Sequence, residues 1–263
     1  MQNESLIDLR RNLFNNGVIK VKNFFSSADI KSIKEAINET LQFPSPFKST
    51  INSDSGMGEF FMDFNNWRRL PKVEEVCKDK KKVNFLKELV NSKKCWLFHD
   101  HVLVKKGKAP STPWHHDRPY YIIKGNKNLS MWIPTSHVPS EYGMVFLAGS
   151  HKIGKVFVPS SFRSGEQLGK KQGFNELTNQ VVNKFEHLSF DLELGDSLVF
   201  LNDTIHSAHP HSSDFIRSSL SIRYLMDGAT LTTKYINATP PFDRLGVKIK
   251  EDGKIPENFF PQV

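Results

Sequence analysis

Two histidines and an aspartate stand side by side in the stretch TPWHHDRPYY, residues 112–121. His115 and Asp117 are separated by a single residue, and on an extended segment such positions project from the same face. An imidazole and a carboxylate placed in this way can converge on one metal ion, while His116 would point the other way. Because so short a motif often arises by chance, it predicts a metal site only if a further ligand lies elsewhere in the chain.

A later stretch, GDSLVFLNDTIHSAH, offers His206 and His209 as candidates for that ligand. Iron(II) sites for oxygen chemistry use two histidines and one carboxylate and leave other coordination positions open. Arg217 follows at the start of the next predicted strand, and arginine can hold a carboxylate through two parallel hydrogen bonds. A dicarboxylate that chelates the iron could be anchored there. Taken singly, these histidines are equally typical of surface or core positions, and Arg217 of an edge strand.

The elements before these residues are mainly helical. Residues 1–42 predict helix, strand and helix, since GVIKVKNF alternates as a half-buried strand does. Ser26 and Asp29 stand at capping-box spacing ahead of the second helix. Residues 43–70 contain prolines and glycines and predict a loop, and residues 72–91 predict a helical region with one interruption.

From Cys95 the hydrophobic period changes to that of strands. The β-rich runs are CWLFHDHVLVKK, LSMWIPTSHV, MVFLAGSH, HLSFDLELGDSLVFL and SSLSIRYLMDG. They predict an antiparallel sandwich or jelly roll with the helices outside it. We expect one domain, 1–263, with a mainly helical flank (1–94), a jelly-roll core (95–228) and a C-terminal tail (229–263). The polar segment 160–185 predicts a lid or an insertion without a role.

The composition is that of a soluble globular protein, with 38% hydrophobic and 24% charged residues. No apolar run approaches the roughly 20 residues of a membrane span, and the start lacks a secretory pattern. Cys77 and Cys95 stand in unrelated contexts, which indicates a reducing, cytoplasmic location and no zinc site. The net charge of +8 raises nucleic-acid binding as an alternative. The lysines are dispersed, however, and favour a solvated surface.

The chain resembles the phytanoyl-CoA dioxygenase family of iron(II)- and 2-oxoglutarate-dependent oxygenases. The stretches that carry the resemblance, in family order, are TPWHHDRPYY, LSMWIPTSHVPSEYGMVFLAGSHK, LELGDSLVFLNDTIHSA and RSSLSIRYLMDGA. The start, LFNNGVIKVKNFFSSADIKSIKEAI, and the end, GKIPENFFPQV, are similar as well. The resemblance implies a mostly β fold with flanking helices around a double-stranded β-helix (jelly-roll, cupin-like) core.

The resemblance also implies an activity and its centre. Iron(II) would be bound by His115, Asp117 and His206, the catalytic residues. 2-Oxoglutarate and O2 would bind at this iron, and succinate and CO2 would be released as an unactivated C–H bond is hydroxylated. Related halogenases replace the carboxylate with a small residue, so the intact Asp117 favours hydroxylation or a similar oxidation.

For the co-substrate, the resemblance implies that Arg217 holds the 5-carboxylate of 2-oxoglutarate. Further implied cofactor-binding residues are Thr112, Ser207, His101 and Trp132. The family commonly has a serine two residues after the second histidine, where this chain has Ala208 beside Ser207. Trp132 is equally consistent with plain core packing.

The fold does not name the substrate. The predicted substrate-binding residues are Tyr120, Tyr121, His99 and Arg118. With His101 and Lys105, they indicate a polar, cationic mouth and favour a small anionic or zwitterionic metabolite, although Arg118 and Lys105 are equally consistent with a solvated surface. Two other functions stay open: a non-catalytic binding protein on the same barrel, and an oxygenase that acts on nucleic acid. We expect a monomer or homodimer without a membrane partner.

Overall fold

The computed structural model describes residues 4–169, 173–211, 216–236 and 240–263. The helices are α1 (Leu6–Asn16), α2 (Ser27–Gln42), α3 (Pro71–Cys77), α4 (Lys80–Leu89) and α5 (Asn179–Val182). The strands up to residue 201 are β1 (Val18–Val21), β2 (Ser49–Asn52), β3 (Gly58–Phe64), β4 (Cys95–Gly107), β5 (Thr112–His115), β6 (Ile123–Lys124), β7 (Leu129–Pro134), β8 (Met144–Leu147), β9 (Val156–Phe157), β10 (Phe174–Asn175), β11 (His187–Ser189) and β12 (Ser197–Leu201). The last strands are β13 (His206–Ala208), β14 (Arg217–Met226) and β15 (Thr230–Leu231).

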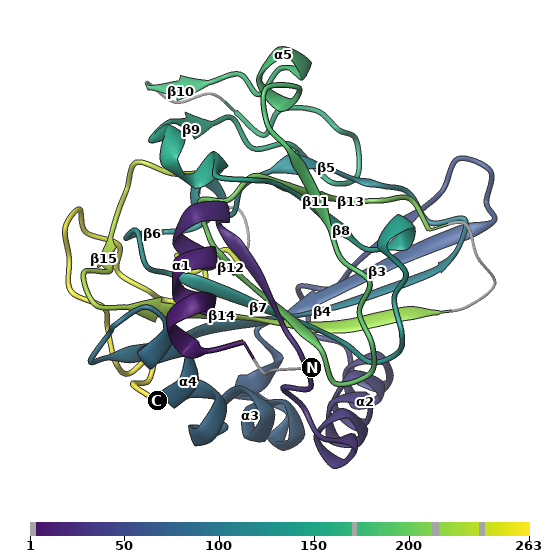
Figure 1. Cartoon of the computed structure of the whole chain (residues 1–263), viewed down its shortest axis with the longest axis horizontal. Coiled ribbons are helices and arrows are strands. Elements are labelled where there is room, and N and C mark those ends of the chain that lie inside the picture. Colours follow the sequence, from purple (N-terminus) through teal and green to yellow (C-terminus); the bar gives the residue numbers. More distant parts are fainter. Residues whose placement is uncertain (1–3, 170–172, 212–215, 237–239) are drawn as a thin grey trace.

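Two antiparallel sheets face one another and form the jelly roll (Figure 1). The larger has seven strands in the order β1-β12-β7-β14-β4-β3-β2, and the smaller has four in the order β11-β8-β13-β5. Apolar residues of both sheets meet between them, among them Trp132 from β7, Phe200 from β12 and Phe146 from β8. The predicted fold class, mostly β with flanking helices around a jelly-roll core, is confirmed.

The helices α2, α3 and α4 lie against the outer face of the larger sheet, away from the smaller one (Figure 1). Ile30, Ile33 and Ile37 of α2 belong to the hydrophobic cluster that also contains sheet residues. The predicted capping box is present: Ser26 Oγ accepts from Asp29 N at 3.2 Å, and the Asp29 carboxylate accepts from Ser26 N at 2.8 Å. This support fixes the larger sheet from behind and leaves its other face for the site.

The prediction of a loop over residues 43–70 is wrong, because β2 and β3 lie there and pair as the edge of the larger sheet. In β3 the apolar residues Phe60, Phe61 and Met62 follow one another, which interrupts the alternation by which strands are recognised. With β1, these strands also mean that the mainly helical flank contributes directly to the sheet.

The segment 160–185 is more ordered than a single long loop. Residues 159–168 form a compact turn in which Leu168 N donates to Pro159 O and Ser161 N to Glu166 O. Residues 170–172 lie outside the described part, and β10 and α5 follow. Within the described residues, no helix combines the length and apolar character that crossing a membrane requires.

Candidate metal centre

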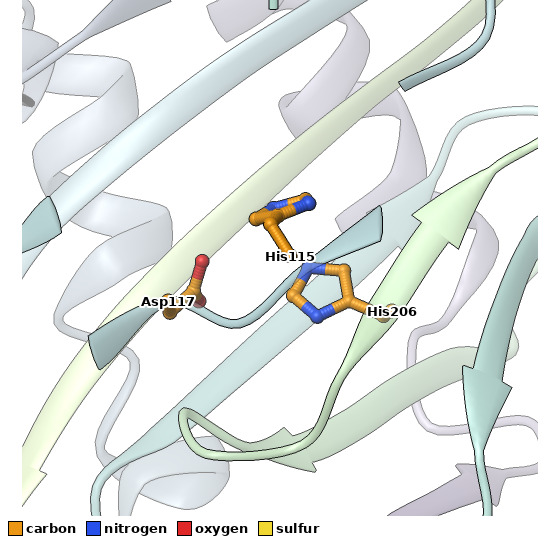
Figure 2. Close-up of side chains that lie close together, drawn as sticks. All are labelled: His115, Asp117 and His206. Carbon is orange, nitrogen blue, oxygen red and sulfur yellow. The ribbon is translucent and has the colours of Figure 1, made fainter. Parts of the chain in front are cut away.

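Three buried side chains converge between the two sheets: His115, Asp117 and His206 (Figure 2). Each offers one ligand atom, and these atoms lie within 4.8 Å of one another. His115 on β5 and His206 on β13 are direct partners across the strand pair, and their ring centroids are 4.2 Å apart. The pairing of two short strands thus brings together histidines that are far apart in the sequence.

Asp117 reaches this point by a turn and not along an extended segment, contrary to the prediction. The strand β5 ends at His115, and Asp117 has helical backbone angles, φ −67° and ψ −32°. Its amide donates to Asn202 O at 2.9 Å, which ties the turn to the strand that precedes His206. His116 does point away, as predicted, since its Nε2 accepts from Phe157 N at 3.0 Å. His209 is not among the clustered side chains.

The backbone orients both imidazoles for metal binding. Nδ1 of His115 lies 2.8 Å from Pro113 O, and Nδ1 of His206 lies 2.9 Å from Thr204 O. A carbonyl can only accept, so each Nδ1 carries the proton and each Nε2 keeps its lone pair. Burial, before any other cause, lowers the pKa of both rings, that of His115 to about 3. Both are therefore neutral at physiological pH, as a metal ligand must be.

Asp117 is held in its charged form. Burial by itself would raise the pKa of Asp117, but Arg223, His206 and His115 together keep it below its ordinary value. Ser130 Oγ donates to Oδ2 at 2.8 Å, and Arg223 Nε lies 3.5 Å from the same oxygen. Two neutral imidazoles and one carboxylate, all buried, fit the donor set of a non-haem iron(II) centre.

Two cavities meet at this centre. The larger has a volume of about 330 Å³ and the smaller of about 50 Å³. Asp117 lines the larger, His206 lines the smaller and His115 lines both. His101, Phe162 and Arg223 are also shared between them. A metal held by the triad would therefore face both spaces.

The smaller cavity brings together all the residues that the sequence assigned to cofactor binding. It is lined by Arg217, Thr112, Ser207, His101 and Trp132. Arg217 is buried and donates to Tyr142 O, and Ser207 Oγ donates to Thr112 O at 2.7 Å. Trp132 lines the cavity and also packs in the core between the sheets, so its position is compatible with both alternatives, cofactor binding and core packing.

Of the four predicted substrate-binding residues, Tyr120 and Tyr121 line the larger cavity. Arg118 does not; it is ion-paired with Asp203 instead. His99 is fully buried against the rings of Phe98 and Tyr121 and lines neither cavity. His99 shares a strand face with His101, but only His101 lines the cavities.

Arg223 is a site residue that the sequence analysis missed. Arg217, Ser219, Ser221 and Arg223 alternate along β14, and all four line the smaller cavity. Their spacing of two residues was a signal, because such positions share one face of a strand. Phe162 was missed as well; its ring centroid lies 4.7 Å from that of His115. No local pattern could have predicted this contact, since it depends on the path of the turn 159–168.

Comparison with known proteins agrees with this geometry. The family model for phytanoyl-CoA dioxygenase (PhyH) matches residues 14–219. No curated protein matches the chain. Among solved structures, the epimerase SnoN, in complex with Fe3+, alpha ketoglutarate and nogalamycin RO, has a TM-score of 0.78 at 18% identity, covering 98% of both chains. The carbocyclase SnoK, from nogalamycin biosynthesis, has a TM-score of 0.76 at 15% identity over 100% of both chains.

A third similar structure is EctD from S. alaskensis with 2-oxoglutarate and 5-hydroxyectoine. Its TM-score is 0.66 at 14% identity, covering 89% of this chain and 82% of that chain. At identities this low, similarity to a solved structure shows a shared fold only. The family model, in contrast, matches most of the sequence. The chain therefore belongs to the phytanoyl-CoA dioxygenase family, and it is an iron(II)- and 2-oxoglutarate-dependent oxygenase.

Proposed function

We propose that this oxygenase hydroxylates an unactivated C–H bond of a small molecule, with iron(II) held by His115, Asp117 and His206. The observation that carries the proposal is the position of the triad, where a narrow cavity with buried cations joins a wider, more apolar one. When bound, iron and 2-oxoglutarate supply the activation of O2: one oxygen atom enters succinate, the other enters the product, and CO2 leaves.

In this proposal 2-oxoglutarate binds with its distal carboxylate in the smaller cavity and its keto-acid end in the space at the metal where the two cavities meet. Its 5-carboxylate would meet Arg217, while its keto-acid end would reach the metal past Thr112 and Ser207. The guanidinium of Arg217 is already fixed by Tyr142 O, so little side-chain freedom would be lost on binding. The residues of the chain thus orient the co-substrate, and the larger cavity is left for the substrate.

The walls of the larger cavity favour a substrate with much apolar surface. Its apolar and aromatic lining includes Phe47, Ile51, Met62, Phe64, Phe162 and Leu168. The preference for a small anionic or zwitterionic metabolite rested on six residues, of which Tyr120, Tyr121 and His101 line this cavity; the cations Arg118 and Lys105, with His99, do not. Arg163 does line it and could meet a polar or anionic end of the substrate. We therefore propose a ring-bearing or otherwise apolar molecule with one such end.

A second outcome of the chemistry is favoured by the structural relatives. SnoN is named as an epimerase and SnoK as a carbocyclase, and both are described as dependent on alpha ketoglutarate. Epimerisation and ring closure also break a C–H bond: ring closure removes two hydrogen atoms and uses the same two-electron oxidation as hydroxylation, whereas epimerisation leaves the oxidation state of the substrate unchanged and needs an added reductant. The product must therefore be analysed to distinguish these reactions from hydroxylation.

The test is a screen for substrate-stimulated succinate release by the iron-loaded protein with 2-oxoglutarate and O2. We expect stimulation by ring-bearing, mostly apolar compounds, with a product that gains one oxygen atom. Asp117→Ala is the control and should release no succinate above background. A product of the same mass as the substrate would show that the reaction is epimerisation and not hydroxylation. Stimulation by small zwitterions alone would contradict the proposed substrate class, and wild-type protein that binds no 2-oxoglutarate would contradict the reaction itself.

A further inference from the structure

Lys105 is a buried lysine on β4 with an unusual environment. It is only 1% exposed, and its ammonium lies 4.8 Å from the ring centroid of Phe60. Nζ donates to Pro110 O at 2.5 Å and to His209 O at 3.3 Å. An ammonium has three donors, so these two carbonyls leave one for another acceptor. The side chain lines the smaller cavity, which is where that acceptor can lie.

A second buried cation stands directly beside it. Lys105 and Arg217 are Cα partners in the pairing of β4 with β14, and both side chains line the smaller cavity. Directly opposed residues of antiparallel strands have Cβ atoms roughly 5 Å apart. The described residues that line this cavity include no aspartate or glutamate. The two basic side chains are thus adjacent, with no carboxylate among the described residues that line this cavity.

Such an arrangement is unfavourable unless an anion joins it. Like charges directly opposite one another destabilise a strand pair, and burial increases the effect because water no longer screens them. Burial, and then the charge of Arg217, lower the pKa of Lys105 to about 6. A carboxylate placed between the two side chains would offset both influences by its opposite charge and favour the charged form of Lys105.

We propose that Lys105 is a second co-substrate-binding cation, which together with Arg217 brackets the distal carboxylate of 2-oxoglutarate and selects dicarboxylic over monocarboxylic 2-oxo acids. The inference rests on the proposed use of the smaller cavity for 2-oxoglutarate. A purely structural role, in which Lys105 only ties the chain near Pro110 to the chain near His209, predicts no such selectivity.

The experiment compares two ligands that chelate the metal in the same way. 2-Oxoglutarate has the distal carboxylate and 2-oxobutyrate lacks it. Their dissociation constants are measured by anaerobic calorimetric titration of iron(II)-loaded protein, a readout independent of turnover. The principal variant is Lys105→Gln, because the amide retains N–H donors for the two carbonyls but carries no charge; Lys105→Met is the second. Lys106→Met is the matched control, since Lys106 is exposed and faces Glu59 at 3.6 Å.

We expect Lys105→Gln to weaken 2-oxoglutarate binding about 10- to 100-fold, the effect of losing one charge-assisted hydrogen bond. Binding of 2-oxobutyrate should stay within about twofold, and Lys106→Met should leave both ligands unchanged. Equal weakening of both ligands, or unchanged 2-oxoglutarate binding, would overturn the inference. If wild-type protein binds 2-oxobutyrate as tightly as 2-oxoglutarate, the inference also fails. If it binds neither, the proposed function fails first.

Discussion

Arg223 is a buried cation that lies against a metal ligand and against both cavities. Its Nε donates to Tyr121 Oη at 3.0 Å and lies 3.5 Å from the Asp117 carboxylate. Its Nη1 is buried and has no hydrogen-bond partner among the described residues. The guanidinium therefore orients the carboxylate ligand and also presents a donor near the point where the cavities meet.

At this residue scale, we predict that Arg223→Met weakens iron(II) binding by about 10-fold or more, because Asp117 loses the charge that orients it. The measurement is an anaerobic metal titration of the folded variant. Arg118→Met is a matched control, since Arg118 is paired with Asp203 away from the cavities. Equal iron affinity in Arg223→Met and wild type would show that Ser130 alone suffices to orient Asp117.

The residues that could be predicted from the sequence are those with a local pattern. The pair His115 and Asp117 stands within three residues, and Arg217 opens a recognisable strand. Ser130 and Phe162 carry no such mark, because each meets the site only through the pairing of distant segments. Arg223 could have been found by counting along the strand in steps of two from Arg217.

Among the elements, the turn 159–168 lies across the larger cavity and we call it the flap. Tyr120 Oη donates to Ser160 O at 2.8 Å and accepts from Ser160 N at 3.0 Å, so one side chain anchors the start of the flap. Arg163 Nη2 donates to Thr50 O at 3.2 Å, which joins the flap to β2 on the other side. Phe162 then closes against His115. Among the described residues of the segment 160–185, only those of the flap line the two cavities.

We predict that Tyr120→Phe makes the flap open more often. The loss of two partly buried hydrogen bonds should increase tryptic cleavage after Arg163 about 5- to 10-fold. Loading wild-type protein anaerobically with iron, 2-oxoglutarate and substrate should reduce the same cleavage. Cleavage after the exposed Lys184 in the same digest is the internal control and should not change. If cleavage after Arg163 responds to neither change, the flap has no gating role.

Strand prediction succeeded for β14, in which polar and apolar residues alternate, and failed for β3, in which Phe60, Phe61 and Met62 follow one another. The core strand β14 was predicted from its run SSLSIRYLMDG, whereas GEFFMDF of β3 was assigned to a loop. Burial does not distinguish the two strands, because nine of the ten residues of β14 and six of the seven residues of β3 are buried; the run of three apolar residues in β3 interrupts the period of two. Asp117 shows a different limit, because its turn depends on a contact with the distant Asn202.

At the scale of the whole molecule, the interior holds an unusual number of neutral imidazoles. Burial is the first cause that lowers the pKa of His99, His101, His115, His116 and His206. The pKa of His99 falls to about 3, against an ordinary value of about 6.5. Asp100 has the opposite effect on proton uptake, since burial raises its pKa to about 6 and the folded protein therefore binds this proton more tightly than the unfolded chain does. One carboxyl cannot offset five imidazoles.

We predict that the metal-free protein loses stability as the pH falls below about 6.5. Below that pH the histidines of the unfolded chain become protonated, whereas the buried imidazoles of the folded protein stay neutral. Each such histidine therefore lowers the free energy of unfolding by roughly 1.4 kcal/mol per pH unit until its folded pKa is reached. Above pH 6.5 their contribution is fully present. The free energy of unfolding is measured by urea titration from pH 8 to pH 5. His99→Gln should reduce the slope by about one proton; an unchanged slope would contradict a neutral buried His99.

We propose that iron(II) is bound by His115, Asp117 and His206. The most direct measurement is anaerobic iron(II) binding by the wild type and by single alanine variants, with folding checked by circular dichroism. We expect His115→Ala, Asp117→Ala and His206→Ala each to lose stoichiometric binding. His209→Ala, three residues from the last ligand and outside the cluster, should bind iron like the wild type. Loss of iron binding in His209→Ala, with iron binding retained in His206→Ala, would contradict the assignment of His206 as the third ligand.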